Sequence, residues 1–229
     1  MFKQIIDAFR KTDEMGRLCE LFAEMLDDGL WLFQQALPLA RGQGDPEAGR
    51  DDFYARDKHI NALEREIRRR IVIHLVAGNE QDVGFSLVLM SVIKDAERIG
   101  DYGKNVRQIG EVYRGRYTRA AYVSSLDAIA EGIAELFPQV RRAFLEGSKT
   151  PAKRAVERSI LLRGQCDMLI NQLLTPGGDV PGDESAALAL RTRYFKRIAA
   201  HLGNIATSVT NPVPMLDYHK NKPLDEPEG

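Results

Sequence analysis

The sequence has little of what marks several large classes of protein. It contains two cysteines in 229 residues, Cys19 and Cys166, and two distant cysteines fit neither a disulfide framework nor a cysteine metal site. No stretch approaches the roughly 20 consecutive apolar residues that a membrane-spanning helix needs. The first residues also lack the basic and apolar regions of a secretory signal. We therefore expect a cytoplasmic protein whose two cysteines are structural.

An excess of charge of either sign is also missing. There are 32 Lys and Arg residues against 33 Asp and Glu residues, and the formal net charge is −1. Such a chain has no overall field that would attract nucleic acid or an anionic membrane surface. The basic run Arg68-Arg69-Arg70 points in different directions on a helix and is offset by Glu64 and Glu66. We expect no nucleic-acid partner.

The common catalytic motifs are absent as well. The sequence has no Gly-rich phosphate loop followed by Lys-Ser or Lys-Thr, and no nucleophile motif surrounds a serine or cysteine. No glutamate is followed by histidine at the third position, as the oxygen-activating helical bundles require. We expect a protein that is not an enzyme.

What the sequence does contain is helical periodicity. Apolar residues recur at intervals of three and four, and no alternating segment flanked by hairpin turns indicates a strand. The expected helices cover residues 2–10, 14–40, about 47–78, 81–114, 120–146, 151–174 and 185–210. The pattern predicts an all-α fold with one three-helix repeat in residues 1–116, a second in residues 117–211, and a loosely ordered Pro-rich tail in residues 212–229.

The third helix of the first repeat has the most regular pattern. Its apolar positions are spaced 4-3-4-3-4-3, as in the seam of antiparallel helices packed side by side: Phe85, Leu89, Val92, Ala96, Ile99, Gly103 and Val106. Gly103 predicts a close backbone approach. His74 and His201 lie on inner stripes of their helices, where buried and hydrogen-bonded histidines are the more common finding.

The two halves of the chain are related to each other. Arg98 aligns with Arg197 and Asn105 with Asn204, an offset of 99 residues. A period this long, with three helices in each unit, predicts two tandem three-helix bundles related by a pseudo-twofold axis.

Two carboxylates stand one turn apart in the third helix. Glu97 and Asp101 share a face, which points away from the apolar seam and toward the bundle surface or an interface. They could share a hard cation through oxygen ligands, or they could form a solvated face paired with Arg98 and Lys104. Both interpretations remain open at this point.

The run Ala96-Glu97-Arg98-Ile99-Gly100-Asp101-Tyr102 resembles the Leu-Glu-Arg-Ile-Gly-Asp-His signature of the PhoU family of phosphate-uptake regulators. Residues 57–67 resemble the middle helix of a PhoU repeat. The resemblance implies two three-helix repeats and multinuclear metal clusters on the bundle surface, with iron the metal most suggested among divalent or trivalent ions. It also implies a membrane phosphate transporter and a sensor kinase as partners, membrane association only through them, and is compatible with a homodimer.

Carried onto this sequence, the family pattern implies one metal site in the first repeat, with five candidate ligands: Asp57, Asn61, Glu64, Glu97 and Asp101. Asn61 brings an oxygen without charge, and Asp95 is an outer ligand or a hydrogen-bond partner. In the second repeat Lys196 and Ala200 replace Glu97 and Asp101, so no site is expected there.

We therefore predict a regulator of phosphate uptake and phosphate homeostasis that acts by contacts with a transporter or its kinase. Two alternatives are retained. One is an accessory regulator of a different, sodium-coupled phosphate or anion transporter, and the other is a helical bundle that binds or stores metal.

Overall fold

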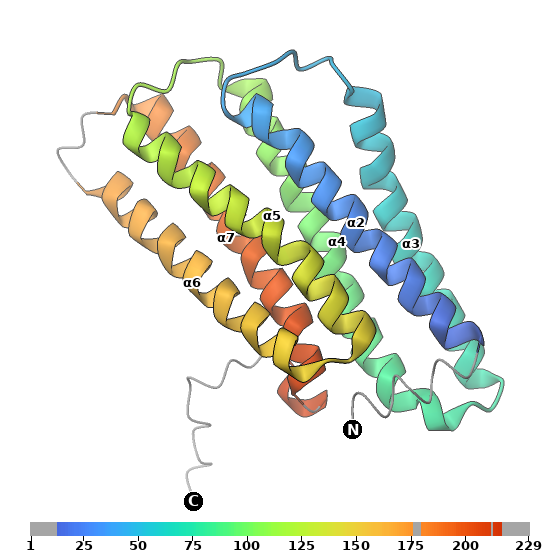
Figure 1. Cartoon of the computed structure of the whole chain (residues 1–229). Helices are drawn as coiled ribbons and strands as arrows, with labels where there is room; N and C mark the ends of the chain where they lie inside the picture. The colour runs from blue at the N-terminus through green and yellow to red at the C-terminus, as the bar shows by residue number, and fades with distance from the viewer. Residues whose placement is uncertain (1–12, 176–179, 212, 217–229) are drawn as a thin grey trace, which may run out of the picture.

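A computed structural model describes residues 13–175, 180–211 and 213–216, and within them the chain is helical without strands. The helix expected over residues 2–10 and most of the expected tail lie outside these residues. Six long helices make up the fold (Figure 1): α2 (Asp13–Ala40), α3 (Arg50–Val76), α4 (Val83–Val112), α5 (Ala120–Glu146), α6 (Lys149–Leu174) and α7 (Gly182–Thr210). Two single-turn 3₁₀ helices accompany them, η1 (Glu80–Asp82) and η2 (Val213–Met215). The all-α prediction is confirmed.

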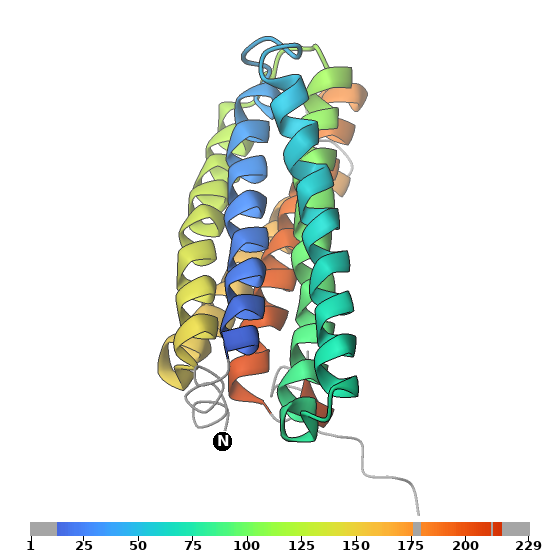
Figure 2. The same ribbon diagram turned by 90° about the vertical axis from the view of Figure 1, so that its right-hand side faces the viewer.

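The six helices run alongside one another as two three-helix units. Helices α2, α3 and α4 pack together, as do α5, α6 and α7, and the units meet where α4 packs on α7 and α2 on α5. The four helices α2, α4, α5 and α7 therefore form the centre, while α3 and α6 lie at opposite ends (Figures 1 and 2). This is the tandem arrangement that the 99-residue offset predicts.

The core is continuous across both units. All seven seam residues of α4 are buried, as their spacing predicts. Aromatic pairs join the units: Phe22 and Phe144 have ring centroids 4.6 Å apart, and Phe33 and Phe195 have centroids 5.3 Å apart. The buried apolar residues of all six helices belong to one cluster, so the two units share a single core.

Glycines let α4 approach α2 closely. A Cβ atom on Gly103 would lie 3.3 Å from Cβ of Leu32, and one on Gly110 would lie 2.3 Å from the backbone carbonyl atoms of Leu39. The close approach predicted for Gly103 is confirmed. Gly110 is the tighter of the two contacts, because it faces backbone rather than a side chain.

Several helix boundaries differ from the sequence expectations. Helix α6 begins at Lys149, so Pro151 is its third residue rather than its first. Proline is tolerated there because the first four helical N–H groups have no partner within the helix. Helix α3 stops at Val76, with Gly78 at φ 92°, and the turn η1 replaces the expected start of the next helix at residue 81.

Cys166 is a free, buried cysteine. Burial raises the pKa of the Cys166 thiol to about 12, so its reactive thiolate form is scarce at neutral pH. None of the described helices combines the length and the apolar composition that a bilayer crossing requires.

Candidate functional site

An ammonium group bridges α3 and α4 at the candidate site. Nζ of Lys104 lies 3.0 and 3.1 Å from the two carboxylate oxygens of Asp57, and 2.8 Å from Oδ1 of Asp101. The Asp57 side chain is 12% exposed and the Lys104 side chain 23%. The structure therefore brings Asp57 and Asp101 together, as predicted, but around a lysine.

The other two candidates on α3 have partners of their own. The amide of Asn61 donates to the backbone carbonyl of Asp57 at 3.0 Å, one turn back. Glu64 is buried and pairs with Arg68 at 2.8 Å. Asn61 thus has its nitrogen engaged with the helix, and the charge of Glu64 is offset within α3.

Glu97 lies on the same face of α4 as Asp101 and is half-buried. Burial is the largest cause that raises the pKa of its carboxyl group, followed by the negative charges of Asp101 and Glu64. Burial and the neighbouring carboxylates thus both disfavour the ionised form of Glu97.

The residues at this site do not fit the metal cluster that the family resemblance implies. Lys104 Nζ stands between the two carboxylates that would have to share an ion, and an ammonium group offers no lone pair to a metal. In the parts of the chain that the structure describes, no group of three or more His, Cys, Asp and Glu side chains is arranged to hold a metal ion.

Asp95 lies on another face of α4. Its Oδ1 accepts hydrogen bonds from the α7 side, with Nδ1 of His201 at 2.6 Å and Nδ2 of Asn204 at 3.0 Å. Since two helical positions differ by about 200° in direction, Asp95 cannot face the same way as Glu97. The structure places it between the two repeats, apart from the predicted ligands.

Around Asp95 the signature residues of the two repeats meet. Tyr102 and His201, which occupy equivalent positions in the alignment of the repeats, stack with ring centroids 5.6 Å apart. Arg197 lies over the Tyr102 ring and donates to its hydroxyl group at 3.2 Å. His201 and His74 are both buried beside a carboxylate, the latter 2.5 Å from Asp82, so the prediction for these two histidines is confirmed.

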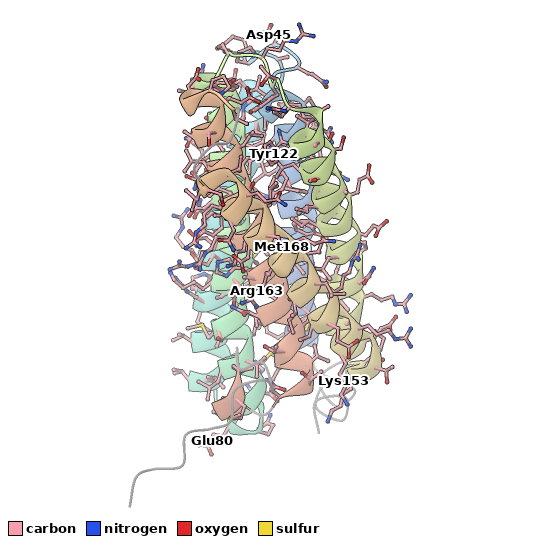
Figure 3. The ribbon with its side chains drawn as sticks, turned by 90° about the vertical axis from the view of Figure 1, so that its left-hand side faces the viewer. Asp45, Glu80, Tyr122, Lys153, Arg163 and Met168 are labelled. Carbon is pink, nitrogen blue, oxygen red and sulfur yellow. The ribbon has the colours of Figure 1, made fainter. Side chains whose placement is uncertain are left out.

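The equivalent face of the second repeat is different. Lys196 of α7 pairs with Asp167 of α6, and Ala200 offers no ligand atom. Figure 3 shows this side of the molecule, with Arg163 and Met168 on α6. This face therefore carries the lysine that the alignment of the repeats places opposite Glu97.

A buried arginine near one end of the bundle is a feature that sequence reasoning missed. Arg191 of α7 is fully buried, donates to the backbone carbonyl of Ala40 at 2.9 Å and lies 3.5 Å from Asp127. It joins the C-terminal end of α2 to the second repeat. Its partners lie 151 and 64 residues away in sequence, and a helical pattern contains no signal for such contacts.

Exposed apolar side chains gather in the hairpin between α3 and α4. Val76 is 83% exposed and Leu87 is 52% exposed. We call the following set the hairpin patch: Val72, Ile73, Val76, Val83 and Leu87. Large contiguous apolar patches on a protein surface mark sites that bind a partner, whereas single exposed apolar side chains are common.

The first three-helix unit is similar to a known protein domain. Residues 15–109 match the model of the PhoU domain. The matched part runs from α2 almost to the end of α4, and it contains every candidate ligand named above.

A relative and two solved structures are similar to larger parts of the chain. An uncharacterized protein of Deinococcus radiodurans is 29% identical over 157 residues, which is 66% of this chain and 56% of the relative; the chain thus spans little more than half of that relative. The crystal structure of the phosphate transport system regulatory protein PhoU from Streptococcus pneumoniae has a TM-score of 0.67 at 14% identity, over 92% of this chain and 95% of that one. The crystal structure of PhoU from Pseudomonas aeruginosa has a TM-score of 0.66 at 18% identity, over 91% and 97%.

Proposed function

The chain is a PhoU-domain protein, and from this membership we propose that it is a non-enzymatic, cytoplasmic regulator of phosphate uptake. It acts by binding a phosphate transporter, the sensor kinase associated with that transporter, or both. The carrying observation is the PhoU domain in residues 15–109, which includes the Glu97 to Tyr102 signature.

The shared architecture supports the proposal. The two PhoU structures have the same fold over more than nine tenths of this chain. Because their sequence identity to it is low, the similarity supports the fold and not by itself the function. The Streptococcus pneumoniae protein is a phosphate transport system regulatory protein, and we extend that role to this chain as the function to be tested.

The hairpin patch is the surface that we assign to the partner. Five apolar side chains that are 40% or more exposed lie there, in the last turns of α3 and the first turns of α4. Covering them with a partner protein would remove their apolar area from water, which is the main favourable contribution in most protein associations. The patch lies within the PhoU domain and close to one end of the bundle (Figure 2).

The experiment is a deletion in the native host, with phosphate uptake measured at high and low external phosphate. We expect the deletion to weaken the dependence of uptake on external phosphate, and the wild-type gene to restore it. Complementation with Val76→Asp plus Leu87→Asp should fail, since a charge in an apolar interface is poorly tolerated. Leu161→Asp is the matched control, because Leu161 is 60% exposed on α6, far from the hairpin. Unchanged uptake in the deletion strain at both concentrations would reject the proposal.

The partner identifies which transporter is involved. A photo-crosslinking residue at Val76 should capture a transporter subunit or a kinase. Capture of a sodium-coupled carrier instead would favour the accessory-regulator alternative, in which the altered second repeat with Lys196 and Ala200 is tolerated.

Metal storage is the less supported alternative, because Lys104 neutralises the best-placed carboxylates. Mass spectrometry of the purified protein measures the bound metals directly. One or more ions per chain, lost in Glu97→Ala plus Asp101→Ala, would restore that alternative.

A further inference from the structure

The contacts of Lys104 have the form of a complete cation site. An ammonium group has three N–H donors, and three carboxylate oxygens lie within 3.1 Å of Nζ, two from Asp57 and one from Asp101. The oxygens come from two helices, as they do when a shared ion joins neighbouring elements. No donor of the ammonium group is left over for a different partner.

The surroundings of the ammonium group are more negative than one lysine requires. Besides its two aspartates, Glu97 lies one turn before Asp101 on the same face of α4, and Glu64 lies on α3. Arg68 offsets Glu64. Removing the positive charge of Lys104 would therefore leave uncompensated carboxylates facing each other across α3 and α4.

In the second repeat an ion pair between a lysine and an aspartate also joins the second and third helices, but the lysine is at a different position. Lys196 of α7 pairs with Asp167 of α6, and it stands where Glu97 stands in the first repeat. The position equivalent to Lys104 is Gly203, which cannot pair. Both repeats thus connect their second and third helices through a lysine and an aspartate, although the two lysines occupy different positions.

We propose that the ammonium group of Lys104 takes the place of a divalent cation between α3 and α4, so that the first repeat is closed without metal and gains a cation site when the lysine is removed. Asp57 and Asp101 both lie about 3 Å from one point in space. Modest movement would bring their oxygens to the distances of about 2.0–2.6 Å at which hard cations are bound. The inference is independent of the phosphate-regulation proposal, since it concerns what holds the two helices together.

The test is a titration of the purified full-length chain with MnCl₂ by calorimetry. Lys104→Ala should bind about one Mn²⁺ per chain, and at least tenfold more tightly than any binding that the wild type shows. Lys196→Ala is the matched control: it also removes a lysine paired with aspartate, but Asp167 has no second carboxylate opposite, because Ala200 stands there. It should stay as weak as the wild type.

Two further variants make the result decisive. Lys104→Gln keeps a polar side chain that can donate hydrogen bonds but removes the charge, and it should gain Mn²⁺ binding even if the alanine variant folds poorly. Adding Asp57→Asn and Asp101→Asn to Lys104→Ala should abolish the gain. Circular dichroism shows whether each variant is folded. A higher melting temperature of Lys104→Ala in the presence of Mn²⁺ than in its absence also supports the proposal. The proposal is overturned if neither Lys104→Ala nor Lys104→Gln binds Mn²⁺ more tightly than the wild type. It is also overturned if the wild type binds Mn²⁺ as tightly as these variants and Asp57→Asn abolishes that binding.

Discussion

Oδ1 of Asp95 in α4 lies 2.6 Å from Nδ1 of His201 in α7, and both side chains are no more than 10% exposed. The same oxygen accepts a hydrogen bond from Asn204. Because 106 residues separate Asp95 from His201, the contact joins the two repeats at the centre of the molecule. It is the polar counterpart of the aromatic pairs that join them in the core.

Asp95→Ala should destabilise the protein. The substitution leaves the buried His201 and the half-buried Asn204 without their acceptor, and an unsatisfied buried polar group costs about 1–3 kcal/mol. Urea unfolding followed by circular dichroism measures the loss. The control is Asp167→Ala, which breaks an ion pair whose aspartate is 52% exposed and should cost about 1 kcal/mol or less. Equal losses in the two variants would contradict the buried role of Asp95.

Gly110→Ala tests the contact between α4 and α2. Its Cβ atom would lie 2.3 Å from both the carbonyl carbon and the carbonyl oxygen of Leu39, so the two helices would have to move apart, at a cost of about 1–3 kcal/mol. Gly164→Ala in α6 is the opposite case, because no atom lies within 4 Å of the new Cβ. It should stabilise the chain by about 0.5–1 kcal/mol, as alanine is the better helix former. Thermal melting separates the two, and a stable Gly110→Ala would mean that the helices are not in backbone contact.

Leu89→Ala tests the seam of α4. Leu89 is fully buried, and truncation in a packed core costs about 2–5 kcal/mol through lost burial and the cavity left behind. Leu87→Ala removes the same atoms two residues earlier from a side chain that is 52% exposed. Its effect on the free energy of unfolding should be several times smaller. If Leu87→Ala cost as much, the face of α4 that we place against the core would be wrong.

Most of the fold could be predicted because its signals are local. The spacing of Phe85 to Val106 gives the buried face of α4, and Arg98 and Arg197 with their neighbours give the repeat. The ends of helices are harder to predict. Proline fits any position in the first turn, so Pro151 does not show that α6 begins two residues earlier, at Lys149. The turn η1 likewise lies before the start of α4. The contacts of Arg191 could not be predicted, because its partners come from two other helices.

The candidate site could be predicted only in part. The sequence places Lys104 three residues after Asp101 and indicates their ion pair, and it places Asp57 on the preceding helix. It does not show that the same ammonium group reaches Asp57, because that depends on how α3 and α4 are packed. For Asp95 the sequence leaves two roles open, an outer ligand or a hydrogen-bond partner, and in the structure Asp95 accepts hydrogen bonds from His201 and Asn204.

Glu97→Gln should stabilise the protein slightly at neutral pH. In the fold, burial first and the charges of Asp101 and Glu64 second raise the pKa of Glu97 above its ordinary value of 4.5. A carboxyl group whose pKa is raised on folding favours the folded state below the unfolded pKa, and this contribution is lost as the pH rises through the folded pKa. At pH 7 the ionised Glu97 therefore disfavours folding, and a neutral amide removes a like-charge pair at i and i+4 that is worth about 0.2–0.5 kcal/mol.

The dependence on pH distinguishes this effect from a change in packing. The advantage of Glu97→Gln in thermal melting should shrink as the pH falls toward the ordinary pKa of 4.5, because the wild-type side chain is then increasingly protonated in the fold. Glu131→Gln on α5 is the control, since Glu131 is exposed and its replacement should change the melting temperature little at any pH. A loss of stability in Glu97→Gln at pH 7 would mean that the ionised carboxylate is held by a cation. In that case a second positive charge, besides Lys104, would stabilise the carboxylates between α3 and α4.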